Sequence, residues 1–391
     1  MEKIRIGDAC ELLNGFAFKS ENYVKKGIRI IRIANVQKGY IEDNTPAFYP
    51  ADSEGLDKYM LEENDLLMSL TGNVGRVAIL QKDMLPAALN QRVACLRLKT
   101  DRITKGYLFH LLNSDFFEQK CIQSSKGVAQ KNMSTEWLKD FLIPVYSVEK
   151  QQEITTTLDN LRDIINKRKQ ELNKLDDLIK ARFVEMFGDP IINSENLPTM
   201  PMTNVCEIID GDRGKNYPTA DEFSDDGYCL FLNAKNVTSS GFNFENCMFI
   251  SKDKDEALRK GKLSRGDVVL TTRGTLGNLA FYTDDIPFEN VRINSGMVIL
   301  RMKQGVVDEI YFIEQFKMQL DDIKEKIASG SAQPQLPIST MNKIQVLVPG
   351  IEEQREFANF VKQVDKSKVV VQKALDEAHL LFDSLMQEYF E

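Results

Sequence analysis

The sequence predicts an α+β fold in which two similar α/β domains are separated by an antiparallel pair of long coiled-coil helices, with pseudo-two-fold symmetry between the halves. Two observations lead to this prediction. The 391-residue chain repeats an ordered set of motifs, and each half ends in a long segment with the apolar spacing of a coiled coil. A repeat of half this length has the size of a domain and is too long for a solenoid unit.

The repeat is carried by three motifs that return in the same order. A Cys-Glu motif begins at Cys10 and Cys206, Leu-x3-Asp-x6-Gly-x2-Gly begins at Leu61 and Leu263, and Glu-x-Gln-x-Glu begins at Glu149 and Glu352. The offsets of 196, 202 and 203 residues are nearly constant along the chain. This steady register indicates a duplicated unit.

Within each half, short runs rich in β-branched residues predict strands. They lie at 28–33, 66–69, 77–80 and 93–98 in the first half and at 228–232, 268–271, 279–282 and 297–301 in the second. A helical stretch follows each set, at Tyr107–Gln123 and Glu309–Ile327. In each half a further strand then ends at a proline, Pro144 or Pro349, and the long helix begins after it.

The long helices are the clearest prediction. Between Lys150 and Phe187 there is neither proline nor glycine, and apolar positions alternate spacings of three and four residues. The positions 203 residues later continue the pattern in the second half. The residues expected to pair the helices are Leu158, Leu161, Ile165, Leu172, Leu175, Ile179, Val361, Val364, Val371, Leu375, Phe382 and Leu385.

Three basic residues, Arg168, Arg182 and Lys368, interrupt this apolar seam, and polar seam positions often fix the register of a helix pair. We expect the two helices to pack on each other; the alternative is that each folds back on its own domain. The predicted regions are the α/β domains 1–146 and 199–350, the helical spacers 147–188 and 351–391, and a linker, 189–198.

Composition excludes several classes of protein. The N-terminus lacks the apolar run of a signal peptide, and no stretch has the roughly 18 apolar residues of a membrane span. Six scattered cysteines without a C-x-x-C pair indicate buried free thiols in a reducing cytoplasm, in preference to disulfides or a metal site. Two distant histidines make a zinc site improbable.

The net charge of −8 argues against a protein that coats nucleic acid non-specifically. Residues 1–148 carry a net charge of +2, whereas residues 198–350 carry −4. Any nucleic-acid surface must therefore be a local patch, or be completed by a basic partner.

Motifs of catalysis are absent from the sequence. There is no G-x-x-x-x-G-K-[ST] phosphate loop, no G-x-G-x-x-G after a strand, and no Asn/Asp-Pro-Pro-aromatic motif for methylation of a base amino group. The G-x-x-G loops at Gly72 and Gly274 are weak phosphate signals and ordinary hairpin turns. We therefore predict a chain that is not an enzyme and binds no cofactor or metal itself.

Polar loops recur in both halves, and their residue types suit DNA. Lysine, arginine, serine and threonine hold phosphates, whereas asparagine, glutamine and arginine contact base edges. The alternative is that glycine and asparagine only form tight turns. Phe16 and Phe18 are expected in the core, in preference to stacking on bases. The candidate DNA-binding residues are Lys19, Asn35, Thr71, Asn73, Arg76, Lys126, Gln130, Lys131, Arg213, Lys215, Lys235, Asn236, Thr272, Arg273, Thr275, Ser331 and Gln333.

Taken together, these motifs resemble the specificity subunit of type I restriction–modification enzymes. The resemblance rests on the duplicated unit, the G-x-x-G turn after an Asp-containing strand, the Gly-x-Ala-Gln loop, the proline ahead of a Glu-x-Gln helix entry and the long terminal helix. It covers essentially the whole chain. Each motif alone is weak, but the ordered set is specific.

The resemblance implies two target-recognition domains, each reading one half of a bipartite, asymmetric site in double-stranded DNA. It also implies a helical spacer that docks two methyltransferase (modification) subunits, which restriction/translocase subunits then join. S-adenosylmethionine, ATP and Mg²⁺ would belong to those partners. We expect a cytoplasmic protein with no membrane association.

Two other functions stay open at the level of the sequence. The chain could carry an unrecognised catalytic activity fused to its readers, or it could be a coiled-coil scaffold that has lost DNA reading. The bases recognised and the spacer length do not follow from the sequence.

Overall fold

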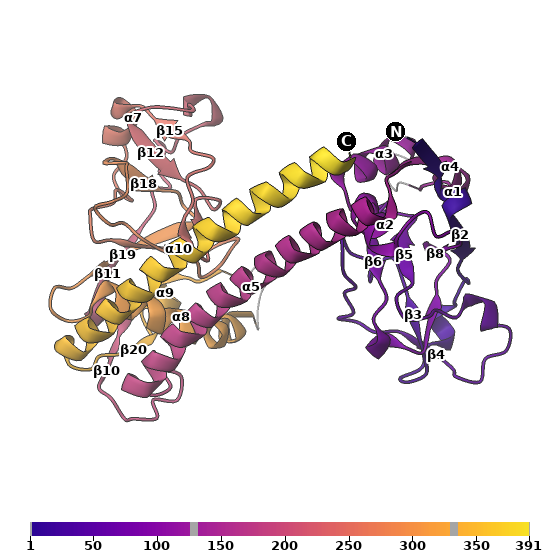
Figure 1. Ribbon diagram of the computed structural model, residues 1–391. Helices are drawn as coiled ribbons and strands as arrows, with labels where there is room; N and C mark the ends of the chain where they lie inside the picture. Colours follow the sequence, from indigo (N-terminus) through magenta and orange to yellow (C-terminus); the bar gives the residue numbers. More distant parts are fainter. Residues whose placement is uncertain (1, 126–131, 329–334, 391) are drawn as a thin grey trace. The chain divides into compact units, whose positions relative to one another are not determined.

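The computed structural model describes residues 2–125, 132–328 and 335–390 (Figure 1). The chain forms two compact units: unit 1 contains residues 1–169 and 372–391, and unit 2 contains residues 170–371. Each unit therefore holds one α/β domain and a segment of both long helices. Within the described residues, no helix has the length and apolarity needed to cross a membrane.

The domain of unit 1 is built on two sheets. The larger is antiparallel with the order β2 (Cys10–Asn14), β8 (Val93–Leu98), β5 (Leu66–Ser69), β6 (Val77–Ile79). The smaller has the order β4 (Phe48–Tyr49), β3 (Ile28–Ile31), β7 (Ala87–Leu89), and its β3–β7 pair is parallel. A third pair joins β1 (Glu2–Arg5) to β9 (Leu142–Val145).

The larger sheet of unit 1 is buried on both faces. Because side chains alternate along a strand, Leu66 and Met68 belong to the core shared with the helices, whereas Leu67 belongs to the core shared with the smaller sheet. This explains why the strand is continuously apolar in sequence, a pattern typical of strands covered on both sides.

The domain of unit 2 repeats this topology. Its larger sheet has the order β11 (Cys206–Asp210), β19 (Met297–Met302), β16 (Val268–Thr271), β17 (Leu279–Phe281), and its smaller sheet has the order β15 (Phe249–Ile250), β12 (Cys229–Leu232), β18 (Val291–Ile293). The third pair joins β10 (Thr199–Pro201) to β20 (Gln345–Leu347). A hairpin of β13 (Val237–Thr238) and β14 (Gly241–Phe242) takes the place of a single bridge between Val36 and Ile41 in unit 1.

The helices are not identical in the two units, and the clearest difference follows β8 and β19. The single helix predicted at 107–123 is wrong: the structure has α2 (Lys105–Leu112) and α3 (Asp115–Ser124), whereas α8 (Glu309–Ala328) is continuous. Ser114 causes the break, because its hydroxyl donates to Leu111 O and accepts the Phe117 N–H, which caps the N-terminus of α3. The remaining short helices are α1 (Ile6–Ala9), α4 (Thr135–Asp140), α6 (Met202–Val205), α7 (Lys252–Ala257), α9 (Ile338–Met341), and the 3₁₀ turns η1 (Ser20–Asn22), η2 (Asp57–Tyr59), η3 (Lys82–Met84) and η4 (Ala220–Glu222).

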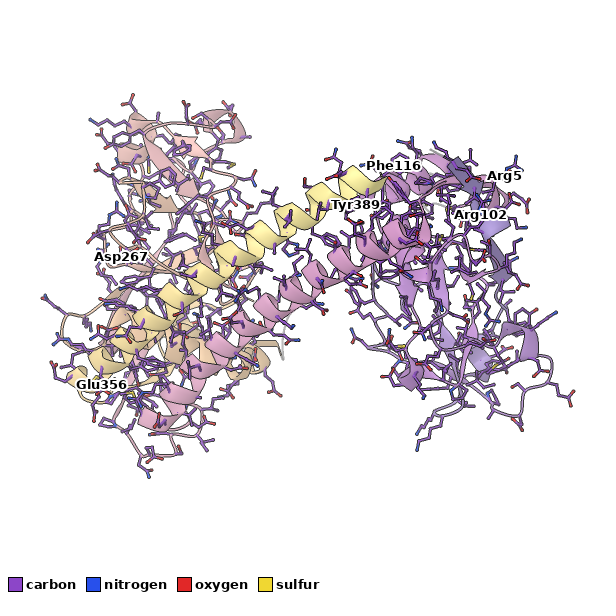
Figure 2. All side chains as sticks on the ribbon, viewed as in Figure 1. Arg5, Arg102, Phe116, Asp267, Glu356 and Tyr389 are labelled. Atoms are coloured by element: carbon purple, nitrogen blue, oxygen red, sulfur yellow. The ribbon has the colours of Figure 1, made fainter. Side chains whose placement is uncertain are left out.

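The aspartate of the Leu-x3-Asp motif is structural in both units. Asp65 accepts two hydrogen bonds from Arg97, and Asp267 (Figure 2) accepts two from Arg301, all at 2.7–2.9 Å. Each aspartate also caps its own turn by accepting a backbone N–H three residues earlier. The Asp65 hydrogen bond is the main cause that raises the pKa of Arg97. These bidentate pairs tie β5 to β8 and β16 to β19.

The glutamine of the Glu-x-Gln-x-Glu motif is also structural. Gln151 is fully buried; its side chain accepts the Thr104 N–H and donates to Arg102 O and Tyr146 O at 2.8–2.9 Å. Gln354 makes the equivalent bonds to Asp308 N, Val306 O and Pro349 O. The motif therefore joins the first turn of each long helix to the residues that lead into α2 in unit 1 and into α8 in unit 2.

The long helices are α5 (Val148–Phe187) and α10 (Ile351–Phe390), each of 40 residues without a break (Figure 1). In unit 2, Arg182 pairs with Glu356 (Figure 2), and Asp176, earlier in α5, pairs with Lys368, later in α10. In unit 1, the start of α5 meets the end of α10, where the Tyr146 hydroxyl donates to Tyr389 O. The predicted antiparallel pairing is therefore confirmed within each unit.

Each long helix packs on its partner helix and on a domain at the same time. All twelve predicted pairing residues are buried or half-buried. Ile154 and Leu158 of α5 lie in the core of unit 1, but Phe183 and Phe187 lie in the core of unit 2 against Tyr311 and Phe357. The alternative of helices that fold back only on their own domains is therefore wrong.

Replacing Gln354 with leucine should lower the thermal stability of unit 2. The substitution removes three hydrogen bonds and leaves buried backbone groups unpaired, at a cost of at least about 1–3 kcal/mol. The measurement is the unfolding midpoint by circular dichroism, with Gln363→Leu, an exposed position on the same helix, as the control. Equal midpoints for the two variants would contradict the structural role.

Replacing Leu375 with alanine should loosen the helix pair. Leu375 is only 6% exposed, so truncation should cost roughly 2–5 kcal/mol, whereas half-buried Leu172 should cost less. Hydrogen exchange of α5 and α10 amides measures the effect. Leu380→Ala on the same helix, where the side chain is 73% exposed, serves as the matched control. Protection equal to that of the control would show that the seam does not hold the helices.

Candidate nucleic-acid interface

The repeated G-x-x-G turns are closed by their own side chains. The Ser69 hydroxyl accepts the Arg76 N–H at 3.1 Å, and the Thr271 hydroxyl accepts the Asn278 N–H at 2.9 Å. Gly72 and Gly274 both have φ of +73° in open space, as a tight turn requires. Each second glycine instead packs closely against a helix side chain, Cys121 in unit 1 and Leu320 in unit 2.

The repeated residues of these turns therefore form a frame, and the residues between them are exposed. In unit 1 the tip presents Asn73 and half-exposed Thr71, whereas in unit 2 it presents Arg273 and Thr275. These four predicted candidates are accessible to a duplex.

The structure corrects the prediction that Asn35 and Asn236 contact DNA. Both are buried, at 3% and 1% exposure. The Asn35 amide donates to Glu42 O and accepts the Arg32 N–H, and the Asn236 amide donates to Asn243 O and Asn246 O. Their repeated Asn-Val motif closes a loop, so these amides are not available to base edges.

Thr272 and Arg76 also serve the fold. Buried Thr272 donates to Gly296 O at 3.0 Å, and its carbonyl accepts the Leu336 N–H. Half-buried Arg76 donates to the side chain of Gln37. Thr272 is therefore not accessible, whereas Arg76 is partly exposed and is held by Gln37. Five further candidates lie outside the described residues: Lys126, Gln130, Lys131, Ser331 and Gln333.

In unit 2 the turn at Arg273 lies between two hollows. One, of about 220 Å³, is lined by side chains that include Asp210, Arg213, Thr272, Arg273 and Gln335. The other, of about 760 Å³, is more open and includes Lys235, Thr275 and Lys324. The structure thus brings together predicted residues that are about 60 positions apart in sequence.

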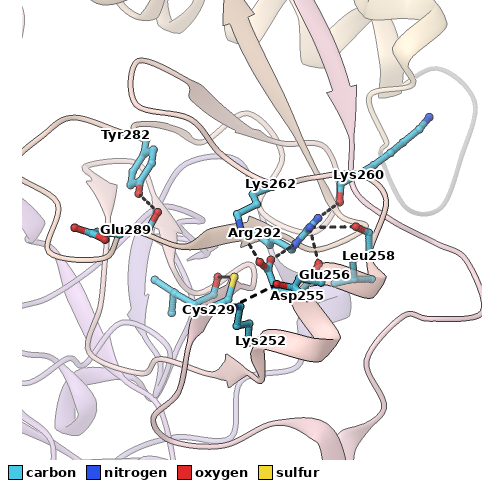
Figure 3. Close-up of polar contacts among 11 residues, drawn as sticks. Cys229, Lys252, Asp255, Glu256, Leu258, Lys260, Lys262, Tyr282, Glu289 and Arg292 are labelled. Atoms are coloured by element: carbon cyan, nitrogen blue, oxygen red, sulfur yellow. Dashed lines mark hydrogen bonds and ion pairs between the residues drawn. The ribbon is translucent and has the colours of Figure 1, made fainter.

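Sequence reasoning missed the loop between α7 and β16 in unit 2, which Figure 3 shows. Buried Arg292 donates to Asp255 and to the carbonyls of Lys260 and Leu258, and Lys262 also pairs with Asp255. Burial opposes the charge of Asp255, but these hydrogen bonds hold its pKa below the usual range. The loop is therefore fixed by contacts beneath it.

This fixed loop presents Arg259 and Lys260, both exposed, beside the predicted residues. The Arg259 N–H donates to Asp212 at 2.7 Å, and the Gly214 N–H donates to the same carboxylate. These backbone bonds, with that of Gly214 first, lower the pKa of Asp212. They bring the Arg259 loop against the loop that carries Arg213 and Lys215.

In unit 1, sequence reasoning missed Gln91 and Arg92. Both are exposed, in the loop after β7, where the Gln91 N–H donates to Phe16 O and the Leu70 N–H donates to Arg92 O. The internal repeat could have pointed to this loop, because Asn90 ahead of β8 has its counterpart in Asn294 ahead of β19. The predicted candidate Lys19 lies three residues after Phe16 and is exposed. Its ammonium group is 3.9 Å from the carboxylate of Glu21.

The expectation for Phe16 and Phe18 is borne out. Both are half-buried in an aromatic cluster with Tyr49 and Tyr59, with ring centroids 4.9–5.2 Å apart. The six cysteines are free thiols, as expected. Buried His110 is hydrogen-bonded to Asp159 at 2.8 Å. Across the described ranges, no group of three or more His, Cys, Asp or Glu side chains could hold a metal ion.

The chain is similar to known proteins over its whole length. It is 23% identical to the type I restriction enzyme EcoBI specificity subunit of Escherichia coli, over 99% of this chain and 85% of that protein. It is 30% identical to the MjaVIII specificity subunit of Methanocaldococcus jannaschii, over 44% of this chain and 43% of that protein.

Solved structures share the fold. The type I restriction-modification S subunit from M. genitalium covers 100% of this chain, with 96% of its own length aligned, a TM-score of 0.56 and 17% identity. A chain from work on complex assembly and conformational transition of the type I R-M system gives a TM-score of 0.57 at 16% identity, covering 100% of this chain and 97% of its own.

The sequence profile of the type I restriction modification DNA specificity domain matches residues 1–174 and, a second time, residues 195–378. The two matches coincide with the two halves of the internal repeat and with the two copies of the sheet topology. This chain therefore belongs to the family of type I restriction modification DNA specificity domains and contains two such domains.

Proposed function

We propose that this chain is the DNA sequence-specificity subunit of a type I restriction–modification complex, and that each domain reads one half of a bipartite, asymmetric site. The observation that carries the proposal is one frame used twice with different exposed tips. Asp65 and Gln151 have counterparts that make the same contacts in unit 2, and the turn glycines recur with positive φ in both units. The tip residues Thr71 and Asn73 are replaced by Arg273 and Thr275.

The two domains share one frame but expose different tip residues, so we expect them to read different half-sites. Base readout depends on the donors and acceptors that each side chain offers to a base edge. Two domains with the same backbone frame would approach a groove in the same way, but different side chains would select different bases. The full site would then not be a palindrome.

We also propose that the long helices dock two methyltransferase subunits and set the spacer between the half-sites, and that restriction/translocase subunits join this core. The chain itself would be non-catalytic. S-adenosylmethionine, ATP and Mg²⁺ would be bound by those partners. The net charge of −4 over 198–350 supports partners that supply much of the phosphate contact.

Exchanging residues 1–146 for the same region of a relative with a different site should change one half of the methylated sequence and leave the other half unchanged. The reason is that the exposed tips of unit 1 lie in this region. Methylome sequencing of a host that carries the subunit with its partners measures the result. The reciprocal exchange of 199–350 is the control and should change the other half. If one exchange changes both halves, the assignment of one domain to one half-site is wrong.

Adding one heptad to both long helices, after Lys169 and after Val371, should lengthen the spacer. Seven residues add about 10 Å of helix, close to three base-pair steps. Both half-sites should persist, since neither domain is altered. Methylome sequencing reads out spacer and half-sites together, and a three-residue insertion, which breaks the heptad phase, is the control. An unchanged spacer would show that the helices do not set it.

A further inference from the structure

Arg213 combines exposure with a fixed orientation. It lies in the loop after β11, and its side chain is 49% exposed. Its Nη2 donates to Asp210 Oδ1 at 3.1 Å and to Ser295 O at 3.3 Å. Asp210 ends β11 and Ser295 lies between β18 and β19, so two separate segments of unit 2 hold the guanidinium in place.

The remaining donors of this guanidinium are available. Arginine has five N–H donors in a planar fork, and among residues 2–125, 132–328 and 335–390 neither Nε nor Nη1 of Arg213 has a hydrogen-bond partner. The adjacent carboxylate of Asp210 repels a phosphate. It does not oppose the uncharged acceptors of a base edge. Guanine offers two of them side by side, O6 and N7, and a single cationic nitrogen with two N–H donors, such as Nη1, can contact both, as a lysine ammonium does.

The neighbouring arginine, Arg273, differs from Arg213 because no carboxylate holds its guanidinium among the residues that the structure describes. Arg273 lines the same hollow and is exposed, but it forms no ion pair with any residue that the structure describes. A free, unrestrained cation suits a phosphate, which a charge can hold from many directions. The two arginines of this hollow therefore differ in the way that base readers and phosphate anchors differ.

Unit 1 lacks this arrangement. Ala17 stands at the position of Arg213, Asn14 at that of Asp210, and Gln91 at that of Ser295. The Asp–Arg pair is therefore not part of the repeated frame. It belongs to the features that distinguish the two readers.

We propose that Arg213 reads a guanine in the half-site of the second domain through hydrogen bonds from Nη1 to O6 and N7, and that Asp210, which holds Nη2, is the positioning residue for this contact. The inference rests on the proposed function and deepens it, because it names a base and the side chain that selects it.

The test uses the subunit assembled with its methyltransferase subunits. Methylome sequencing first gives the half-site that exchange of 199–350 alters. Synthetic duplexes then carry 7-deazaguanine, which lacks the N7 acceptor, at each guanine of that half-site in turn. The wild-type complex should lose about 5- to 150-fold in affinity at one of these guanines. The Arg213→Ala complex should bind the normal and modified duplexes equally.

Salt dependence separates base reading from phosphate binding. Arg213→Ala should leave the slope of log affinity against log salt unchanged, whereas Arg273→Ala should reduce it by about 1. Lys215→Ala, in the same loop as Arg213, is the matched control and should retain sensitivity to 7-deazaguanine. Asp210→Asn should weaken discrimination at the guanine while raising affinity for unrelated DNA, which a merely structural role would not do.

Three results would overturn the inference. They are a half-site without a G·C pair, an Arg213→Ala complex that stays as sensitive to 7-deazaguanine as the wild type at every guanine, and an Arg213→Ala complex that weakens on all duplexes with a smaller salt slope. Full discrimination by Asp210→Asn would overturn the positioning role. If the exchange of 199–350 alters neither half-site, the proposed function fails first. If it alters one half-site and the Arg213 variant keeps every base preference, only this inference fails.

Discussion

The whole structure depends on where the last turns of the long helices are buried. The end of α5 is buried in the core of unit 2, where α10 begins, and the end of α10 is buried in the core of unit 1, where α5 begins. Phe183 and Phe187 end α5 among Tyr311 and Phe357, and Phe390 ends α10 beside Tyr107. Aromatic side chains of this size bury 150–250 Å² each and dominate the energetics of the cores they join. Neither core is therefore complete with residues from one half of the sequence alone. This explains why duplication of the unit leads to a shared helix pair and not to two independent proteins.

The contacts that recur in both units are internal hydrogen bonds of the fold, which do not depend on the DNA sequence that each domain reads. Asp65 with Arg97, Gln151 with Thr104, and buried Asn35 within its loop are all internal hydrogen bonds. Each has a counterpart 201–204 residues later that makes the equivalent bond. A buried polar group that loses its partner is expensive, so these residues are constrained by folding. The exposed tips carry no such constraint and differ between the halves.

This distinction explains how far the sequence could predict the structure. The short runs 66–69 and 268–271 predicted their strands to the residue, because they are rich in the large apolar side chains that strands buried on both faces require. The break at Ser114 was missed, because a capping serine inside an apolar run resembles any polar residue on a helix face. Asn35 was mistaken for a DNA contact, because its residue type suits base edges and turn closure equally. Only the loop geometry separates these two uses.

The residues of the candidate interface that were missed share one physical feature: they have no local sequence signal. Arg259 is placed by the buried Arg292–Asp255 pair, which joins residues 37 positions apart. Arg213, Arg292 and Arg301 each face an aspartate, so part of the positive charge of unit 2 is neutralised within the unit. A domain of net negative charge that neutralises its own arginines attracts DNA weakly at long range. Its fixed guanidinium donors can still discriminate between bases at contact, where direction matters more than charge. Such a domain is suited to selecting a sequence within a complex whose other members hold the duplex.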